Sequence, residues 1–191
     1  EGLVEEPHRA LRHVDVVWNA LHGSYGEDGQ VQRVLEGLKI PFTGSSAVAS
    51  ALSMNKDMAK QIYEKYSLNT PRHELVYKED LDSTRLISIF QSYLSPVIVK
   101  PRNAGSSIGI SLAHSFIELK DAVKEALTHS DRVIVEEFIK CREATCGVVD
   151  KFQNELHYAL VPIEIQVPRG KNFFDYNSKY IGCNGKFSEM N

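Results

Sequence analysis

The stretch Pro96-Val97-Ile98-Val99-Lys100-Pro101-Arg102-Asn103-Ala104-Gly105-Ser106-Ser107-Ile108-Gly109-Ile110 is the most informative part of this chain. An apolar run ends in a lysine, and a loop of glycine and serine leads into a second run typical of a β-strand. We predict a hairpin whose tip carries Gly105, Ser106 and Ser107 and whose base carries Lys100. Glycine lets backbone N–H groups approach an anion, while serine hydroxyls and an ammonium add donors and charge. This favours a polyphosphate ligand, although most loops of this composition are ordinary turns.

The hairpin differs from the P-loop pattern, because no Gly-Lys-Ser or Gly-Lys-Thr opens a helix here. The composition is that of an ordinary globular protein, with 191 residues, 42% hydrophobic and 25% charged. A formal net charge of -3 gives no footprint for nucleic acid. No apolar run is long enough to span a membrane, and we expect no signal peptide.

Three cysteines, Cys141, Cys146 and Cys183, lack the spacing of a metal site. We therefore expect reduced thiols that pack in the interior, and a cytoplasmic protein. The chain begins at Glu1 rather than at methionine and stops at Asn191 in a loop-like run. We expect both ends to be cuts rather than natural boundaries.

Apolar spacing predicts alternating strands and helices along most of the chain. Strands are expected over residues 14–20, 40–44, 73–77, 97–99, 108–112, 132–139, 143–149 and 156–165. Helices are expected to begin near residues 31, 45, 55, 81 and 115, with Asn55 as an N-cap and Ser115 and Glu118 as a capping box. Three side chains of the helix after Asn55 are expected to be buried: Met58, Ile62 and Tyr66. The last three strands have short connections, which favours an antiparallel sheet.

These elements predict a mixed α/β and α+β chain in three parts. Residues 1–53 are interpreted as the remainder of an N-terminal α/β domain, and residues 54–165 as a central nucleotide-binding domain with an antiparallel sheet. Residues 166–191 are rich in Gly, Asn, Lys and aromatic residues and lack a periodic pattern. A long segment of this kind favours a functional lid over a passive connector.

Charged residues at element ends are the next candidates for a binding site. Lys56 lies in the first turn of a helix, where a cation opposes the helix dipole, although an exposed surface lysine is the more usual outcome. Glu136 and Glu137 end an apolar strand. Because neighbouring residues of a strand face opposite ways, only one of the two can point into a given site, and both could simply be surface charges.

Three further candidates lie in loops or turns. Glu143 could accept hydrogen bonds from sugar hydroxyls, or could pair with Arg142. His22 stands in a glycine-rich turn and could donate to an anion, although a solvated loop histidine is more usual. The segment Phe174-Asp175-Tyr176-Asn177-Ser178-Lys179-Tyr180 carries aromatic residues that are costly to expose unless the loop closes on something.

Taken in order, these motifs resemble those of the D-alanine–D-alanine ligase family. The resemblance runs from about Asp15 to Tyr180. The matching segments are Leu21-His22-Gly23, Gly26-Glu27-Asp28-Gly29 and Gln32, Pro41 to Ser45, Ala51 to Lys56, Val97 to Pro101, Gly105 to Gly109, Val135 to Phe138, Arg142-Glu143 and Phe174 to Tyr180. The resemblance implies an ATP-grasp fold, here incomplete. It also implies ATP- and magnesium-dependent joining of two D-alanines, through an acyl phosphate, for peptidoglycan and hence the cell wall.

The resemblance also assigns roles at the nucleotide. Lys56 and Lys100 would hold the phosphates, and Lys179 would reach the γ-phosphate from a lid called the ω-loop. Glu143 would bind the ribose. The loop over the phosphates would consist of Gly105, Ser106 and Ser107. The hinge that reads adenine would consist of Glu136, Glu137, Phe138 and Ile139.

On the amino-acid side, the resemblance places Ser106 and Tyr180 in a hydrogen-bonded group at the first D-alanine and His22 near the reacting centre. The residues that hold magnesium in the family would follow Asn191, so we expect no metal ligand within this chain. A glutamate that anchors the first D-alanine would precede Glu1. We therefore expect these 191 residues alone to form no dipeptide.

Two alternatives remain open at this point. One is a related D-alanine–D-serine or depsipeptide ligase, although Tyr180 argues against the depsipeptide type. The other is a catalytically incomplete ATP-grasp piece that acts as a nucleotide-binding or assembly module. In either case we expect small-molecule partners, neither nucleic acid nor membrane, and a homodimer at full length.

Overall fold

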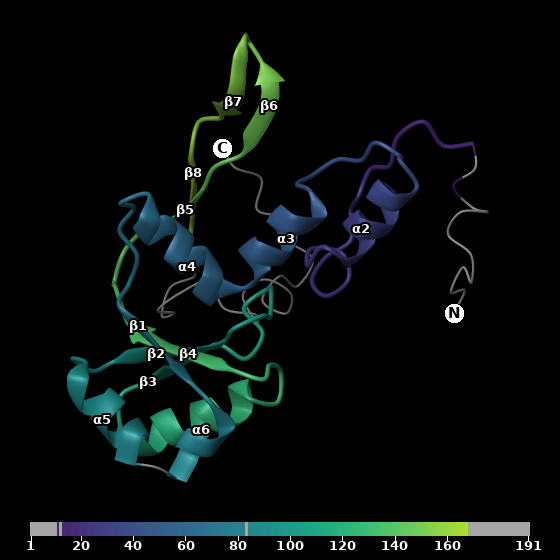
Figure 1. Ribbon diagram of the computed structural model, residues 1–191. Coiled ribbons are helices and arrows are strands. Elements are labelled where there is room, and N and C mark those ends of the chain that lie inside the picture. Colours follow the sequence, from purple (N-terminus) through teal and green to yellow (C-terminus); the bar gives the residue numbers. More distant parts are fainter. Residues whose placement is uncertain (1–10, 12, 83, 168–191) are drawn as a thin grey trace, which may run out of the picture. The chain divides into compact units, whose positions relative to one another are not determined.

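The computed structural model describes residues 11, 13–82 and 84–167 (Figure 1). The helices are α2 (Gln30–Gly37), α3 (Ala47–Met54), α4 (Lys56–Lys65), the 3-10 helix η1 (Lys78–Asp82), α5 (Thr84–Ser92) and α6 (Phe116–Ala126). The strands are β1 (His73–Val76), β2 (Val97–Pro101), β3 (Ser111–Ala113), β4 (Val133–Glu137), β5 (Glu143–Thr145), β6 (Val148–Phe152), β7 (Glu155–Ala159) and β8 (Ile163–Ile165). The chain divides into two compact units, Glu1–Phe138 and Ile139–Asn191.

The first unit is organised around a four-stranded antiparallel sheet in the order β1-β4-β2-β3. Strands β2 and β3 form the hairpin that the sequence predicts, with Val97 opposite Ala113. The second strand of the hairpin begins at Ser111 rather than at Ile108, because residues 105–110 are taken up by the loop. The long connection through α6 brings β4 back between β1 and β2.

The two faces of this sheet differ in chemistry because side chains alternate along each strand. Val97, Val99, Val133 and Val135 point to one face and are fully buried. They pack against α5 and α6, which cover that face (Figure 1) and contribute buried apolar residues. This is the core, and its residues account for most of the apolar surface that the first unit removes from water.

The opposite face carries Ile98, Lys100, Ile134 and Glu136 and lies under α4. Glu136 is opposite Ile98 on β2 and opposite His73 on β1. The start of α4 is held to the turn after β2 by a hydrogen bond from the Lys56 backbone N–H to the carbonyl of Arg102, at 3.1 Å. The alternation therefore places an apolar layer on one side of the sheet, whereas the other side carries a lysine and a carboxylate beside two buried isoleucines.

Both predicted helix caps are confirmed. The side chain of Asn55 accepts a hydrogen bond from the Met58 N–H at the start of α4. Ser115 accepts from the Glu118 N–H at the start of α6, and the Glu118 carboxylate accepts in return from the His114 N–H. Such caps satisfy backbone donors that have no partner inside the helix.

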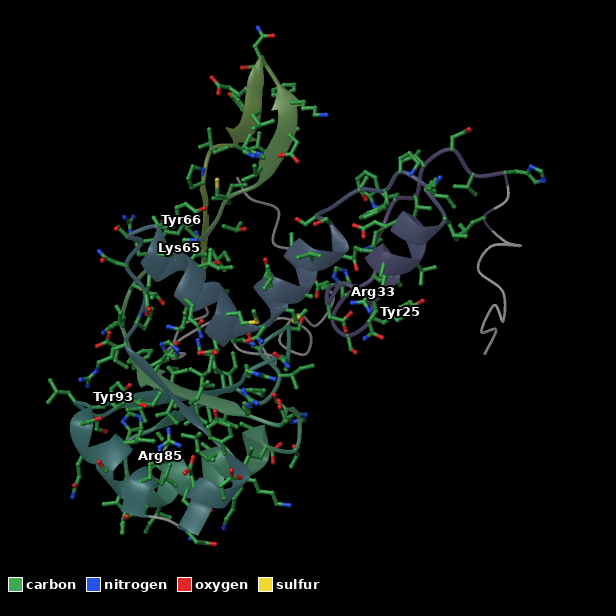
Figure 2. The ribbon with its side chains drawn as sticks, viewed as in Figure 1. Tyr25, Arg33, Lys65, Tyr66, Arg85 and Tyr93 are labelled. Carbon is green, nitrogen blue, oxygen red and sulfur yellow. The ribbon has the colours of Figure 1, made fainter. Side chains whose placement is uncertain are left out.

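The predicted buried face of α4 is wrong. Met58 and Ile62 are 42% and 37% exposed, and Tyr66 just beyond the helix is 71% exposed (Figure 2). The buried residues of α4 are instead Ala59 and Lys60. The reason is that α4 lies over the polar face of the sheet, so its inner side carries a small residue and a charged residue rather than large apolar ones.

Four predicted strands also need correction. Residues 14–20 and 40–44 form no strand, and are joined by a single parallel bridge between Val17 and Phe42. The predicted strands over 143–149 and 156–165 are each divided in two. In the second unit, β5 pairs with β8 and β6 pairs with β7, both antiparallel. The antiparallel arrangement is as predicted, but the single sheet is not.

Two of the three cysteines, Cys141 and Cys146, are not packing residues. Both are exposed, because the two-stranded ladders of the second unit bury few side chains. Cys183 lies outside the described residues. Within the described part of the chain, no helix has both the length and the apolar composition needed to cross a membrane. The predicted domain boundaries after residues 53 and 165 stay a prediction.

Candidate functional site

A cavity of about 630 Å³ in the first unit collects several of the predicted site residues. Its lining includes His22 from the glycine-rich turn, Lys56 from α4, and Gly105 and Ser106 from the hairpin loop. Gly105 approaches the turn closely, since a Cβ built on it would lie 3.9 Å from the Cα of Gly23. Segments far apart in the sequence therefore meet at this cavity.

The turn that carries His22 is held by its own polar side chains. Asp28 accepts hydrogen bonds from the N–H groups of Tyr25 and Gln30. Burial would raise the pKa of Asp28, but these hydrogen bonds outweigh it and hold the pKa below its usual value. The buried side chain of Gln32 donates to the carbonyl of Gly26 at 2.8 Å. The turn is thus a fixed wall of the cavity rather than a loose connector.

Lys56 joins α4 to the hairpin loop. Its Nζ donates to the carbonyl of Pro101 at 3.0 Å and to the carbonyl of Ala104. Burial and the positive charge of Lys100 lower the pKa of Lys56 to about 8, and the carboxylate of Glu136 opposes that shift. The lysine therefore carries its charge at neutral pH but gives up its proton more easily than an exposed lysine does.

A second cavity, of about 250 Å³, lies beside the first. Lys56 and Ser53 line both cavities, and Lys100, Lys60 and Glu136 line the second. Glu136 is 4% exposed and forms ion pairs with Lys100 and Lys60. The predicted lysines Lys56 and Lys100 thus meet at one cavity, although they come from a helix and a strand 44 residues apart.

The loop that joins β2 to β3, residues 102–110, has an unusual backbone. Ser106 and Ser107 both have left-handed φ values, 55° and 59°. Non-glycine residues in this region are uncommon and concentrate at ligand clamps and switches. Gly109 also has a positive φ, and a Cβ there would lie 2.8 Å from the Pro101 ring, so only glycine fits. The loop therefore packs closely on the end of β2 at Gly109.

The remaining predicted site residues fall into three groups. Glu137 turns away from Glu136, and its carboxylate accepts from the Arg72 N–H at 2.8 Å. Phe138 ends the first unit, whereas Ile139, which is 51% exposed, and Glu143 on β5 belong to the second. Lys179, Tyr180 and the rest of the predicted lid lie outside the described residues. Within residues 11, 13–82 and 84–167, no group of three or more His, Cys, Asp or Glu could hold a metal ion.

Sequence analysis did not select Lys60, Ser50, Ser53 or Met54, which also line these cavities. Lys60 stands four residues after Lys56, a spacing that places two side chains on the same face of a helix. That spacing was the available signal for Lys60. The small residues Ser50 and Ser53 gave no signal, because serine in a helix is ordinary.

Comparison with known proteins agrees with this geometry. The family description "D-ala D-ala ligase C-terminus" matches residues 62–190, and "D-ala D-ala ligase N-terminus" matches residues 2–45. The chain belongs to the D-alanine–D-alanine ligase family. One relative is the D-alanine–D-alanine ligase A of Clostridium perfringens (strain 13 / Type A). The two sequences are 40% identical over 181 residues, which are 94% of this chain and 55% of the relative. The D-alanine–D-alanine ligase of Aquifex aeolicus is 41% identical over 87% of this chain and 53% of the relative.

Solved structures of the family share the ATP-grasp fold of this chain. The VanG D-Ala:D-Ser ligase from Enterococcus faecalis matches with a TM-score of 0.74 and 34% identity, over 87% of this chain and 47% of that one. The D-alanine–D-alanine ligase from Coxiella burnetii matches with a TM-score of 0.71 and 30% identity, over 79% and 44%. The chain spans about half the length of the curated relatives it matches.

The lowered pKa of Lys56 predicts a pH dependence of anion binding. A bound phosphate favours the charged ammonium, so it should raise the pKa of Lys56 from about 8. Because free Lys56 loses its proton as the pH rises through this value, affinity for a phosphate anion such as inorganic tripolyphosphate should fall about tenfold between pH 7 and pH 9. Calorimetry at pH 8 in buffers of different ionisation enthalpy should show uptake of up to about half a proton.

Arginine at this position stays charged over the whole range. Lys56→Arg should therefore bind the same anion without proton uptake and with a flatter pH profile. Equal proton uptake by the parent chain and the arginine variant would show that another group titrates.

Proposed function

We propose that the protein carrying this chain is a ligase that joins two D-alanines at the expense of ATP, for peptidoglycan synthesis. The single observation that carries this proposal is the position of Lys56, which lines both cavities. One cavity holds Lys100 and Glu136, and the other holds His22, Gly105 and Ser106. A nucleotide with its phosphates at Lys56 would have its γ-phosphate next to a space large enough for an amino acid.

The chemistry that fits this arrangement is phosphoryl transfer followed by amine attack. A carboxylate oxygen of the first D-alanine attacks the γ-phosphorus, the bond to the β-phosphate oxygen breaks, and ADP leaves. The amine of the second D-alanine then attacks the acyl carbon, gives up a proton, and releases inorganic phosphate. Such a transfer needs cations on the developing charge and exact positioning rather than a protein nucleophile. Lys56 and Lys100 would supply the cations.

We assign the remaining sequence-based roles as part of the same proposal. Ser106 and Tyr180 would position the first D-alanine, with His22 near the reacting centre. Lys179 would close over the γ-phosphate and help to keep water from the acyl phosphate. Glu136 to Ile139 would adjoin the adenine and Glu143 the ribose. Bound magnesium would neutralise the β- and γ-phosphates, and we place its oxygen ligands outside the described residues.

Removing the Lys100 ammonium should weaken nucleotide binding. Lys100→Ala deletes a charge-assisted contact to phosphate, worth roughly 1.5–3 kcal/mol, which corresponds to a roughly 10- to 150-fold weaker affinity. Calorimetric titration with ATP measures this directly. Lys124→Ala is the matched control. The Lys124 side chain is 56% exposed, and it lies on α6, which covers the opposite face of the sheet from Lys100. An unchanged affinity in Lys100→Ala would remove Lys100 from the phosphate site.

The second substrate distinguishes this proposal from its alternatives. We expect D-alanine to be preferred over D-lactate, because Tyr180 together with Ser106 suits dipeptide formation. D-Serine belongs in the same assay, since VanG, which matches this chain, is described as a D-Ala:D-Ser ligase. ATP turnover of the full-length protein is followed with D-alanine plus each second substrate at neutral pH. Faster turnover with D-lactate or D-serine would reassign the substrate.

We further propose a cytoplasmic, homodimeric enzyme. The absence of a membrane-spanning helix in the described residues and the odd number of cysteines are compatible with that location. Light scattering of the full-length protein would give its mass in solution.

A further inference from the structure

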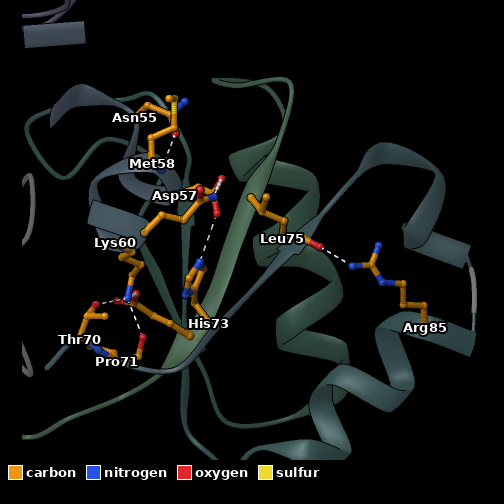
Figure 3. Close-up of polar contacts among 11 residues, drawn as sticks. Asn55, Asp57, Met58, Lys60, Thr70, Pro71, His73, Leu75 and Arg85 are labelled. Carbon is orange, nitrogen blue, oxygen red and sulfur yellow. Dashed lines mark hydrogen bonds and ion pairs between the residues drawn. The ribbon is translucent and has the colours of Figure 1, made fainter. Parts of the chain in front are cut away.

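Lys60 is the most deeply buried charged side chain of α4, and three protein oxygens surround its ammonium. Its side chain is 8% exposed. Nζ donates to the Thr70 hydroxyl at 2.8 Å and to the Pro71 carbonyl at 2.7 Å (Figure 3). The third oxygen belongs to the carboxylate of Glu136, which forms an ion pair with Lys60 at 2.9 Å. Two hydrogen bonds and one ion pair therefore hold this ammonium in place beside Glu136.

Glu136 stands between this deeply buried lysine and a more exposed one. Its Oε2 faces Lys60 and its Oε1 faces Lys100, whose side chain is 20% exposed. His73, opposite Glu136 in the sheet, directs its Nε2 to Asp57 at 3.3 Å instead. Among the described residues, Lys60 and Lys100 are therefore the cations in direct ion-pair contact with the carboxylate, and Lys56 acts on it without such a contact.

A phosphate that binds Lys100 must compete with Glu136 for that ammonium. If Lys100 were the sole partner, its departure would leave a buried carboxylate uncompensated, which is strongly unfavourable. With Lys60 in place, the carboxylate keeps one buried ion pair. The transfer of Lys100 from Glu136 to phosphate then costs much less.

We propose that Lys60 is a positioning residue for nucleotide binding: it retains Glu136 so that Lys100 is free to bind phosphate. This inference rests on the proposed function. Lys60 itself touches no substrate, and its effect passes entirely through Glu136 and Lys100. It should therefore matter much more for ligands that carry phosphates than for those that lack them.

The test compares three ligands by calorimetry on the same variant. In Lys60→Met, which keeps the length of the side chain and removes its charge, affinity for ATP and for inorganic tripolyphosphate should fall about tenfold. Affinity for adenosine should stay within about twofold of the parent protein. Lys65→Met is the matched control, because Lys65 is exposed in the last turn of the same helix (Figure 2), and all three affinities should be unchanged.

A double variant tests whether the effect passes through Lys100. Adding Lys60→Met to Lys100→Ala should change ATP affinity by less than about twofold, because no ammonium remains to be released. Thr70→Val removes one acceptor and keeps the charge of Lys60. It should lower ATP and tripolyphosphate affinity about threefold, and it decides the question if Lys60→Met fails to fold.

The outcomes separate this inference from the proposed function. If the parent protein binds neither ATP nor tripolyphosphate, both are overturned. If the parent binds both and the Lys60 or Thr70 variants lose adenosine as strongly as ATP, the role of Lys60 is structural and this inference alone is overturned. This inference alone is also overturned if Lys60→Met leaves ATP affinity unchanged. It is likewise overturned if adding Lys60→Met to Lys100→Ala lowers ATP affinity a further tenfold.

Discussion

Replacing Glu136 by glutamine should lower the free energy of unfolding by about 3–5 kcal/mol, because removing one member of a buried ionic group leaves uncompensated charge. Glu136 is 4% exposed and pairs with Lys60 and Lys100. Loss of its negative charge leaves these two ammonium groups without a carboxylate partner. Urea unfolding followed by circular dichroism measures the change.

Glu74→Gln is the matched control on the same sheet. Glu74 lies on β1 and is exposed, so the free energy of unfolding should change by less than about 0.5 kcal/mol. Adding Lys60→Met to Glu136→Gln should recover part of the lost stability, because one stranded charge is removed. A loss as small in Glu136→Gln as in Glu74→Gln would mean that water compensates the charges and that the group is not buried.

Replacing Gly29 by alanine should lower the free energy of unfolding by about 2–4 kcal/mol, from backbone strain and overpacking together. Gly29 precedes α2 with a φ of 93°, a left-handed value. A Cβ there would lie 2.4 Å from the carbonyl oxygen of Ala47 at the start of α3. The backbone of α3 must move to admit it, and α3 carries part of the wall of the larger cavity.

Gly37→Ala, at the other end of α2, should change the free energy of unfolding in the opposite direction. Gly37 lies in α2, and a Cβ built on it meets nothing within 4 Å. Alanine should therefore stabilise the chain by about 0.4–1 kcal/mol, by reducing the freedom of the unfolded state. The two variants are measured side by side by urea unfolding. Destabilisation of similar size in both would point to a requirement for glycine in α2 that is unrelated to α3.

The sequence predicted those parts of the fold that depend on neighbouring residues. The hairpin over 97–113, the cap at Asn55 and the capping box at Ser115 follow from turn chemistry and from side chains that bond nearby backbone groups. The apolar face of α6 was also recognisable from its helical spacing, because this helix covers the apolar face of the sheet.

Parts that depend on tertiary partners were harder to predict. Helix α4 has a plausible apolar stripe in Met58 and Ile62, yet it buries Lys60, because the sheet offers it carboxylate and carbonyl oxygens. Apolar periodicity identifies a buried face only where the partner surface is apolar too. The division of residues 143–165 into four short strands reflects pairing choices that no local pattern specified.

The candidate site shows the same division. Lys56 and Lys100 were selected from a helix start and a strand end, and the structure brings both to one cavity. The spatial relation between Lys56 and the two cavities could not be predicted, since it depends on where the turn at residues 22–29 meets the hairpin loop. The role proposed for Lys60 could not be predicted either, because it depends on the three oxygens of Thr70, Pro71 and Glu136 that surround its ammonium.

Strand β4 links the chemistry of the site to the fidelity of folding. Val133 and Val135 fill the core, and Glu136, the next residue, faces the lysines from the other side. A slip of one residue in the pairing of β4 would push a carboxylate into the apolar interior and a valine beneath two ammonium groups. Glu136 therefore disfavours any pairing of β4 that is shifted by one residue. Insertions or deletions of a single residue in β4 should be far less tolerated than those of two, which preserve the sidedness of the strand.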